Sequence, residues 1–152
     1  RDYIVLCHGW LPPARRNVDA KVCWNPGDRT ASRICSHNGK PAQTWLRVVA
    51  HCSRSGEAFS LVAARLATGR RHQIRAHSAH LGHLTASDGK YGPASAFLAD
   101  HQWSLQNFLH RYRLAFRDSL GIVREVASPL PRDLAVALEE LEPRPSDPRS
   151  AA

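Results

Sequence analysis

A change of hydrophobic period near residue 68 constrains the fold more than any other feature of this sequence. The alternation of residue types in Phe59 to Leu66 is partial but sufficient to predict a β-strand, whose side chains have a two-residue period. Thr68-Gly69 interrupts the alternation, and a helical stretch then runs from Arg71 to Leu81. It ends at Gly82, the residue type expected just past a helix C-terminus. The chain therefore combines strands with at least one helix.

Further strands are predicted on both sides of this helix, separated by turn residues such as Asn38-Gly39. Strands are predicted at Tyr3–His8, Val18–Trp24, Thr44–His51, Phe59–Leu66, Leu109–Phe116 and Val123–Ala127, and further helices at Trp103–Phe108 and Leu134–Leu141. Asp133 is expected to cap the last helix. This order of strands and helices indicates an α+β fold with a mixed, mostly antiparallel sheet and flanking helices.

Length and composition predict a single domain. The chain has 152 residues, which is ample for one hydrophobic core and short for two. All predicted elements lie in residues 1–141, whereas residues 142–152 are rich in proline and polar residues and are expected to form a flexible tail. No apolar run approaches the length of a membrane-spanning helix.

The charge of the chain favours a polyanionic partner. Lysine and arginine number 21 against 13 acidic residues, which gives a formal net charge of +8. Basic domains bind nucleic acids well because each neutralised phosphate releases counterions. Arginine far outnumbers lysine, and guanidinium groups suit phosphate contacts and stacking on bases. A high-GC codon bias would explain the arginine content equally well.

The four cysteines predict an intracellular protein. Cys7, Cys23, Cys35 and Cys52 have no CxxC spacing, and no signal-like hydrophobic segment precedes them. We expect them to be reduced and mostly to fill the core, as in cytoplasmic or organellar proteins that are not secreted. The four tryptophans are likewise expected to pack in the core or at an interface.

Six segments, in order over about residues 3 to 134 and centred on TGRRHQIRAHSAHLGHL at 68–84, resemble the RluA family of RNA pseudouridine synthases. The central one, Thr68 to Leu84, is similar to the family's TGRTHQIRVHLAHLGHP segment. The others are YIVLCHG at 3–9, GKPAQT at 39–44, SDGKYG at 87–92, LHRYRLAF at 109–116 and PLPRDL at 129–134. They are similar to the family's YxALVxG, GKPAxT, GDPLYG, LHAxxLxF and PxPxDL patterns.

The resemblance implies an activity and two catalytic residues. Enzymes of this family break the N1–C1′ bond of uridine, turn the uracil and rejoin it through C5, without a metal or organic cofactor. Tyr3 matches the tyrosine that packs on the uracil and helps to remove the C5 proton. Arg75 matches the arginine that pairs with the catalytic aspartate, and such a pair keeps the carboxylate ionised. The implied substrates are structured ribosomal or transfer RNAs.

Four residues around Arg75 are predicted to contact RNA: Arg70, Arg71, His72 and Gln73. Arg70 and Arg71 lie at the N-terminus of the predicted helix, which is already positive, so cations placed there favour a bound phosphate. His72 is expected to support the active-site loop or the RNA backbone. The spacing of His77, His80 and His83 is similar to that of a metal site, but Gly82 ends the helix before His83, and no metal is expected.

The family's nucleophilic aspartate, which lies in an HRLDxxTSG-type motif, is missing from the sequence. The nearest string, His110 to Arg113, contains no aspartate. We therefore expect the chain to be the C-terminal part of a catalytic domain whose aspartate lies upstream, and to have little activity alone. One alternative is a non-catalytic RNA-binding or ribosome-assembly protein that retains the fold. Another is a two-chain enzyme whose aspartate lies on a separate polypeptide.

Overall fold

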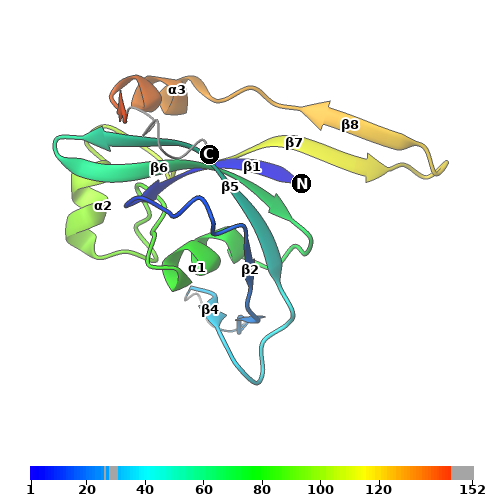
Figure 1. Cartoon of the computed structure of the whole chain (residues 1–152). Helices are drawn as coiled ribbons and strands as arrows, with labels where there is room; N and C mark the ends of the chain where they lie inside the picture. Colours follow the sequence, from blue (N-terminus) through cyan, green and yellow to red (C-terminus); the bar gives the residue numbers. More distant parts are fainter. Residues whose placement is uncertain (26, 28–30, 145–152) are drawn as a thin grey trace.

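An antiparallel sheet forms the centre of the molecule in the computed structural model, which describes residues 1–25, 27 and 31–144 (Figure 1). Its strands are β1 (Asp2–His8), β2 (Asn17–Asp19), β5 (Gln43–Arg54), β6 (Glu57–Leu66), β7 (Leu109–Arg117), β8 (Val123–Ala127) and β9 (Glu142–Pro143). They follow the order β2-β5-β6-β1-β7-β8, and β9 pairs with the far end of β5. The predicted α+β class with a mostly antiparallel sheet is confirmed.

Among the described residues, three helices flank the sheet: α1 (Gln73–His80), α2 (Ala94–Asp100) and α3 (Arg132–Glu139). Figure 1 shows α1 and α2 on one side of the sheet and α3 on the other. A small second sheet, formed by β3 (Val22–Cys23) and β4 (Arg33–Ile34), lies next to α1. Within the described part of the chain, no helix is long and apolar enough to cross a membrane.

Both faces of the sheet carry a hydrophobic core, because successive side chains of a strand point to opposite faces. Val5, Val62 and Ile74 belong to the core on the α1 side, where Tyr3 packs against them. Leu6, Phe59 and Leu134 belong to the core on the α3 side. The central strands are thus buried on both faces, and β1 fixes the position of each core relative to the other.

Two predicted elements differ from the structure. Residues 18–24 do not form one strand, because the chain leaves β5 after Asp19 and pairs Val22 with Lys40 instead. Residues 103–108 do not form a helix; the helix of this region is α2, and Phe108 is completely buried in the core at the start of β7. Asp133 lies in the first turn of α3 and accepts a hydrogen bond from Gln106 rather than capping the helix.

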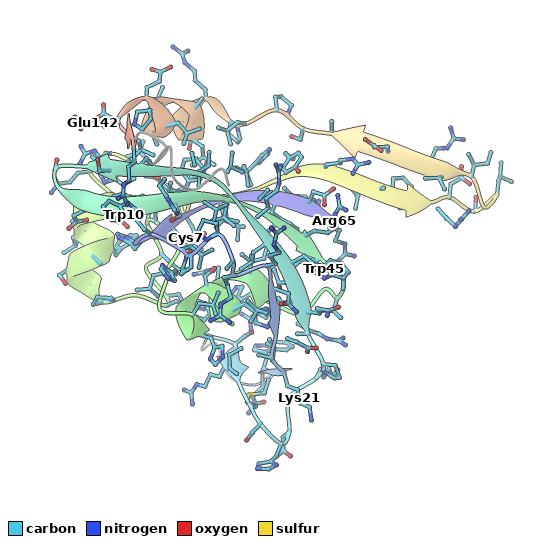
Figure 2. All side chains as sticks on the ribbon, in the orientation of Figure 1. Cys7, Trp10, Lys21, Trp45, Arg65 and Glu142 are labelled. Atoms are coloured by element: carbon cyan, nitrogen blue, oxygen red, sulfur yellow. A yellow bond between two sulfur atoms is a disulfide. The ribbon has the colours of Figure 1, made fainter. Side chains whose placement is uncertain are left out.

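The expectation that all four cysteines are reduced is wrong for one pair. Cys23 and Cys35 form a disulfide, because the pairing of β3 with β4 brings their Cα atoms to 5.9 Å. Figure 2 shows this bond in the lobe that carries Lys21. Cys7 and Cys52 are free and buried in the two cores, as predicted for packing residues. Burial raises the pKa of the Cys7 thiol to about 12.

The tryptophans divide between core and surface. Trp103 packs edge-on against Phe59, which agrees with the prediction of a packing role. Trp10, Trp24 and Trp45 are each more than two-fifths exposed, so they are surface residues in the structure. Trp45 shares its exposed face of β5 with Arg47 and Val49, as the alternation predicted.

The predicted tail begins later than residue 142. Glu142 and Pro143 pair with Ser53 and Cys52 of β5, so the sheet extends two residues past the predicted boundary. Residues 145–152 lie outside the described part of the chain, and the flexibility of this segment stays a prediction.

We expect Phe108→Ala to lower the free energy of unfolding by about 3–5 kcal/mol, because a fully buried aromatic ring leaves a cavity when truncated. Phe116→Ala, on the strand that directly follows Phe108, is a matched control, since Phe116 is 45% exposed; it should cost less than about 1 kcal/mol. Urea unfolding followed by circular dichroism measures both. Equal losses for the two variants would contradict the assignment of the core.

Candidate active site

A hollow of about 410 Å³ opens where the start of β1 meets the N-terminus of α1. Five of the six predicted site residues line it: Tyr3, Arg70, His72, Gln73 and Arg75. Its remaining walls come from Leu66, Ile74, Gln106, Asn107 and Leu109. The fold thus brings together residues that are about 70 positions apart in the sequence.

The side chain of Gln73 attaches helix α1, which also carries Arg75, to the sheet. Its side-chain oxygen accepts hydrogen bonds from the Thr68 hydroxyl at 2.8 Å and the Arg70 backbone N–H at 3.0 Å. Its nitrogen donates to the Gln43 carbonyl and the Thr44 hydroxyl, both at 3.0 Å. An amide has two donors and two acceptor positions, so all are used within the protein. Gln73 is 2% exposed and has no capacity left for RNA in this conformation.

His77 continues this attachment one helical turn later. The Thr44 hydroxyl lies 2.9 Å from its Nδ1, and the Ala20 carbonyl lies 2.9 Å from its Nε2. Because a carbonyl can only accept, Nε2 carries the proton and Nδ1 accepts from Thr44. Burial lowers the pKa of His77, which keeps the ring neutral. Both nitrogens are occupied, so His77 has none left for a metal ion.

His72 occupies the turn that starts α1. Its backbone has φ +52°, a left-handed conformation that non-glycine residues seldom adopt. Its Nδ1 lies 3.4 Å from the hydroxyl of Tyr91, and the two rings meet edge to face. Burial, followed by the positive charges of Arg75 and Arg71, lowers the pKa of His72. The ring is therefore neutral at pH 7 and faces the hollow.

Arg75 forms a bidentate ion pair with Asp88. Its Nε donates to one carboxylate oxygen at 2.8 Å, and its Nη2 donates to the other at 2.5 Å. The carboxylate also accepts the Thr85 hydroxyl and the backbone N–H groups of Lys90 and Tyr91. Burial would raise the pKa of Asp88, but these hydrogen bonds, above all that from Arg75, lower it on balance. Asp88 is ionised, and both of its carboxylate oxygens accept hydrogen bonds from the protein.

This pairing leaves one side of the guanidinium open. Nη1 of Arg75 makes no hydrogen bond to any residue that the structure describes, and the side chain is 19% exposed. The ring of Tyr91 lies 5.0 Å from the guanidinium carbon and covers one of its faces. The hydrogen bond with Asp88 raises the pKa of Arg75, which is therefore a permanent, oriented cation at the edge of the hollow.

Arg70 and Arg71 extend the positive region beside the hollow. Arg70 donates from Nε to the Pro41 carbonyl at 3.0 Å, which directs its guanidinium along the rim. Arg71 is exposed and does not line the hollow; its guanidinium carbon lies 4.6 Å from the ring centre of Trp24. The Ser32 hydroxyl donates to the Arg71 carbonyl, so this stack is tied to β4. A stacked arginine and tryptophan form a platform suited to a nucleic acid base.

Of the residues that the structure describes, no aspartate or glutamate lines the hollow. Asp88, the acidic residue paired with Arg75, is 1% exposed at its side chain and holds five hydrogen bonds. It cannot reach a substrate atom without losing the ion pair. The hollow therefore offers a tyrosine, a neutral histidine and an arginine, but no nucleophilic carboxylate from the described residues.

Asp88 and Tyr91 belong to the site although they were not among the site residues predicted from the sequence. Both belong to the SDGKYG segment, whose similarity to GDPLYG was the available signal. Asn107 was also missed: it lines the hollow, and its Oδ1 is buried without a partner among the described residues. Its amide nitrogen donates to Thr85 and Ala86, which holds the side chain beside the Asp88 turn.

Comparisons with known proteins show which proteins this chain is similar to. The sequence profile of a family described as RNA pseudouridylate synthase matches residues 1–80. An RNA pseudouridine synthase of Chloroflexus aurantiacus is 35% identical over 136 residues, which are 89% of this chain and 40% of that protein. Ribosomal large subunit pseudouridine synthase D of Nitrosomonas europaea is 36% identical over 149 residues, 95% of this chain and 42% of that protein. The chain spans about two fifths of the length of these relatives.

A solved structure agrees with these matches. Human RNA Pseudouridylate Synthase Domain Containing 1 superposes with a TM-score of 0.74 at 27% identity. The match covers 94% of this chain and 59% of the human one. Nearly all of the fold described above is thus shared with that protein.

We expect Asp88→Asn to lower the free energy of unfolding by about 3 kcal/mol, because it leaves the partly buried Arg75 without its counter-charge. Asp118→Asn removes an ion pair with Arg124 at the tip of the β7–β8 hairpin and serves as the matched control, with a much smaller expected loss. Urea unfolding of both variants measures the difference. Asp88→Asn with wild-type stability would show that the pair does not hold the site.

Proposed function

Because the chain belongs to the RNA pseudouridylate synthase family, we propose that the protein containing it converts uridine to pseudouridine in RNA. The hollow that brings Tyr3 and Arg75 together is the observation that carries this proposal. The resemblance to RluA-type synthases is confirmed by the family match and by the named relatives. These comparisons do not favour the alternative of a non-catalytic RNA-binding protein.

The reaction is an isomerisation and needs no external reactant. The N1–C1′ bond breaks, the uracil turns, and a C5–C1′ bond forms; the proton lost from C5 is balanced by one gained at N1. The target uridine has to leave its stack to reach the hollow, which costs a few kcal/mol that contacts with the protein must offset. The reaction requires a carboxylate near C1′, a group that removes the C5 proton, and a cation that holds the carboxylate.

Arg75 has the geometry for the last of these roles. Asp88 and Tyr91 fix its guanidinium on three sides, and Nη1 is the part that remains for a further anion. We assign this position to the catalytic aspartate, carried by a segment upstream of Arg1 in the longer protein or by a second chain. A pre-oriented cation stabilises such a carboxylate without any reorganisation during the reaction. Asp88 acts as a positioning residue for Arg75.

Tyr3 forms the apolar wall on which the uracil would lie. It packs against the α1-side core and neighbours Leu66 and Leu109, so its ring is held in place. In this position the ring can stack on the base, and its hydroxyl can take part in removing the C5 proton. His72 is neutral and can accept or donate a hydrogen bond to the substrate. No metal or organic cofactor is assigned a role in the reaction.

Outside the hollow, we assign the contacts with RNA to Arg70 and Arg71. Arg70 on the rim and the Arg71–Trp24 stack form a basic surface suited to the phosphates and bases that flank the target. Gln73, predicted from the sequence to touch RNA, is better assigned to holding α1, since all its polar positions are used. The substrate class is structured ribosomal or transfer RNA, which places the protein inside the cell.

We expect Arg75→Lys to reduce the rate of pseudouridine formation by about 10²-fold or more, because lysine cannot keep the bidentate pair and still present a second donor. The assay measures tritium release from C5-labelled uridine, with the longer protein that includes an HRLD-type segment as the enzyme. Arg124→Lys, on the exposed hairpin, is the matched control and should keep the wild-type rate. The 152 residues alone should release little tritium. The proposal is contradicted if a longer protein that carries the HRLD motif releases no tritium.

We expect Arg71→Thr to weaken RNA binding and to reduce the slope of log Kd against log salt by about 1, the value for one lost phosphate contact. Trp24→Ala should weaken binding with little change in this slope, because stacking releases no counterion. Fluorescence anisotropy with a labelled hairpin RNA at several salt concentrations measures both. Trp45→Ala, on the exposed face of β5, is the control. Unchanged affinity in both test variants would remove this surface from the proposed interface.

A further inference from the structure

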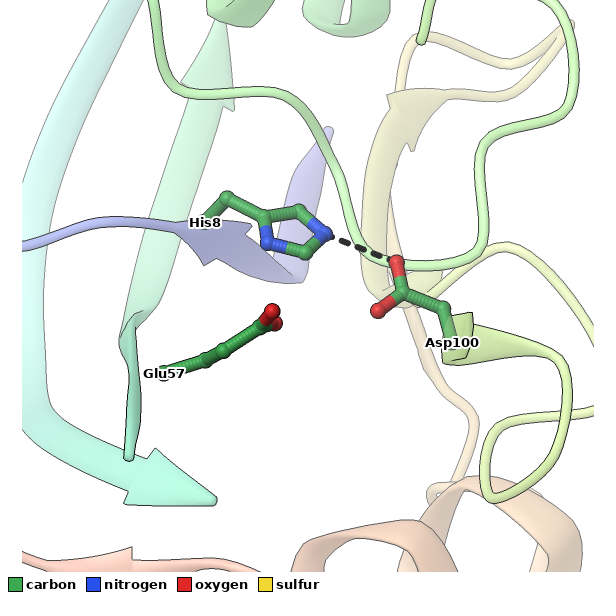
Figure 3. A group of neighbouring side chains, drawn as sticks. All are labelled: His8, Glu57 and Asp100. Carbon is green, nitrogen blue, oxygen red and sulfur yellow. Dashed lines mark hydrogen bonds and ion pairs between the residues drawn. The ribbon is translucent and has the colours of Figure 1, made fainter. Parts of the chain in front are cut away.

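A second group of titratable side chains lies away from the hollow, where the end of β1 meets the β5–β6 turn and the end of α2. It contains His8, Glu57 and Asp100, whose ligand atoms all lie within 4.8 Å of one another (Figure 3). His8 Nε2 donates to one oxygen of Asp100 at 2.7 Å, and the Ser87 backbone N–H donates to the same oxygen at 2.7 Å. Each residue comes from a different element, so the tertiary structure creates the group.

The charges of this group are not balanced by a neighbouring cation. Asp100 is 3% exposed at its side chain, and a buried carboxylate costs several kcal/mol unless a charge or hydrogen bonds compensate it. Among the residues that the structure describes, no lysine or arginine lies within ion-pair distance of Asp100 or Glu57. Arg54 borders the same space but pairs with Glu140 and lies over the ring of Trp103.

One oxygen of the buried carboxylate is also unused. Both hydrogen bonds to Asp100 go to Oδ2, and Oδ1 has no partner within the described residues. Figure 3 shows this second oxygen turned to the side on which the Glu57 carboxylate lies. A hollow of about 250 Å³ adjoins the group and includes Glu57 and Asp100 in its lining. A nearly buried carboxylate oxygen thus faces a space that a ligand can enter.

We propose that His8, Glu57 and Asp100 bind one divalent transition-metal ion, with Zn²⁺ as the best chemical match. One imidazole and two carboxylates form a ligand set that zinc accepts, whereas Mg²⁺ and Ca²⁺ prefer oxygen ligands alone. Two negative charges compensate a divalent cation. Ligands on one tetrahedral zinc ion lie roughly 3.3–3.6 Å apart, so the group needs only small side-chain movements. Water molecules from the adjacent hollow would complete the coordination.

The ion has a structural role in this proposal and lies outside the hollow that Tyr3 and Arg75 line. It ties the end of β1 to the β5–β6 turn and to α2, in addition to the hydrogen bond between His8 and Asp100. Asp100 also holds Ser87, which has φ +57° and directly precedes Asp88. A ligand that binds only the folded state raises its stability. The ion therefore stabilises the turn that carries the partner of Arg75.

The test measures metal binding by the 152-residue chain after treatment with EDTA, by calorimetric titration with ZnCl₂ and by the visible spectrum of bound Co²⁺. We expect one high-affinity ion per chain and a rise in melting temperature of about 5 °C or more at saturating Zn²⁺. Glu57→Gln should weaken binding by at least about tenfold and abolish this rise, without unfolding the protein, because Glu57 is exposed. His8→Ala should have the same effect on binding.

Matched controls separate this site from adventitious zinc. Glu139→Gln is the same substitution at an exposed position of α3, and His80→Ala removes a histidine outside the group; both should bind Zn²⁺ like the wild type. MgCl₂ should cause no shift. The proposal is overturned if the wild type binds no Zn²⁺, or if Glu57→Gln and Glu139→Gln bind it equally. Neither readout depends on RNA or on pseudouridine formation.

Discussion

The attachment of α1 to the sheet through Gln73 is the interaction on which the rest of the site depends. A buried amide that fills both donor and both acceptor positions joins the Thr68–Arg70 loop, β5 and the start of the helix at one point. His77 repeats the attachment to Thr44 one turn later, so two residues on successive turns join the helix to β5. Because these polar groups are buried, breaking any of these bonds would leave a partner unsatisfied. The direction of Arg75 follows from this fixed helix.

Fixing the helix makes the charge arrangement at the hollow possible. Arg75 projects from α1 toward the turn at residues 87–91, where Asp88 accepts it and Tyr91 covers it. Asp88 is in turn oriented by backbone N–H groups and by Thr85, so the ion pair rests on several independent contacts. The result is a rigid cation with one free edge beside the Tyr3 ring. Such pre-organisation is what an isomerase needs if a further carboxylate is to be held in a single geometry.

Much of the fold and part of the site could be predicted from the sequence. The period change at residue 68 and Gly82 located α1 to within a few residues, and the alternation in Thr44–His51 gave the exposed face of β5. The resemblance placed Tyr3 and Arg75 together, and the structure brings both to one hollow. The Arg75–Asp88 pair was not predicted, because the two residues are 13 positions apart and lie on either side of a turn. Local sequence patterns do not indicate which residue a turn brings next to a helix. The Cys23–Cys35 disulfide was not predicted either, because it depends on the pairing of two strands of only two residues each.

The sequence by itself determined the main strands of the sheet, the helix α1 that follows β6, the basic character of the chain and the family signature around Arg75. Each of these is a local property, since periodicity, turn residues and charge act over a few positions along the chain. The tertiary structure decided which carboxylate Arg75 holds, that Gln73 supports the helix instead of facing a ligand, and that His8, Glu57 and Asp100 meet at the end of the sheet. These outcomes depend on contacts between distant segments, and burial then determines which polar groups must be satisfied there. The physical reason is that a side chain's neighbours in space, not its neighbours in sequence, set its charge environment and its remaining hydrogen-bonding capacity.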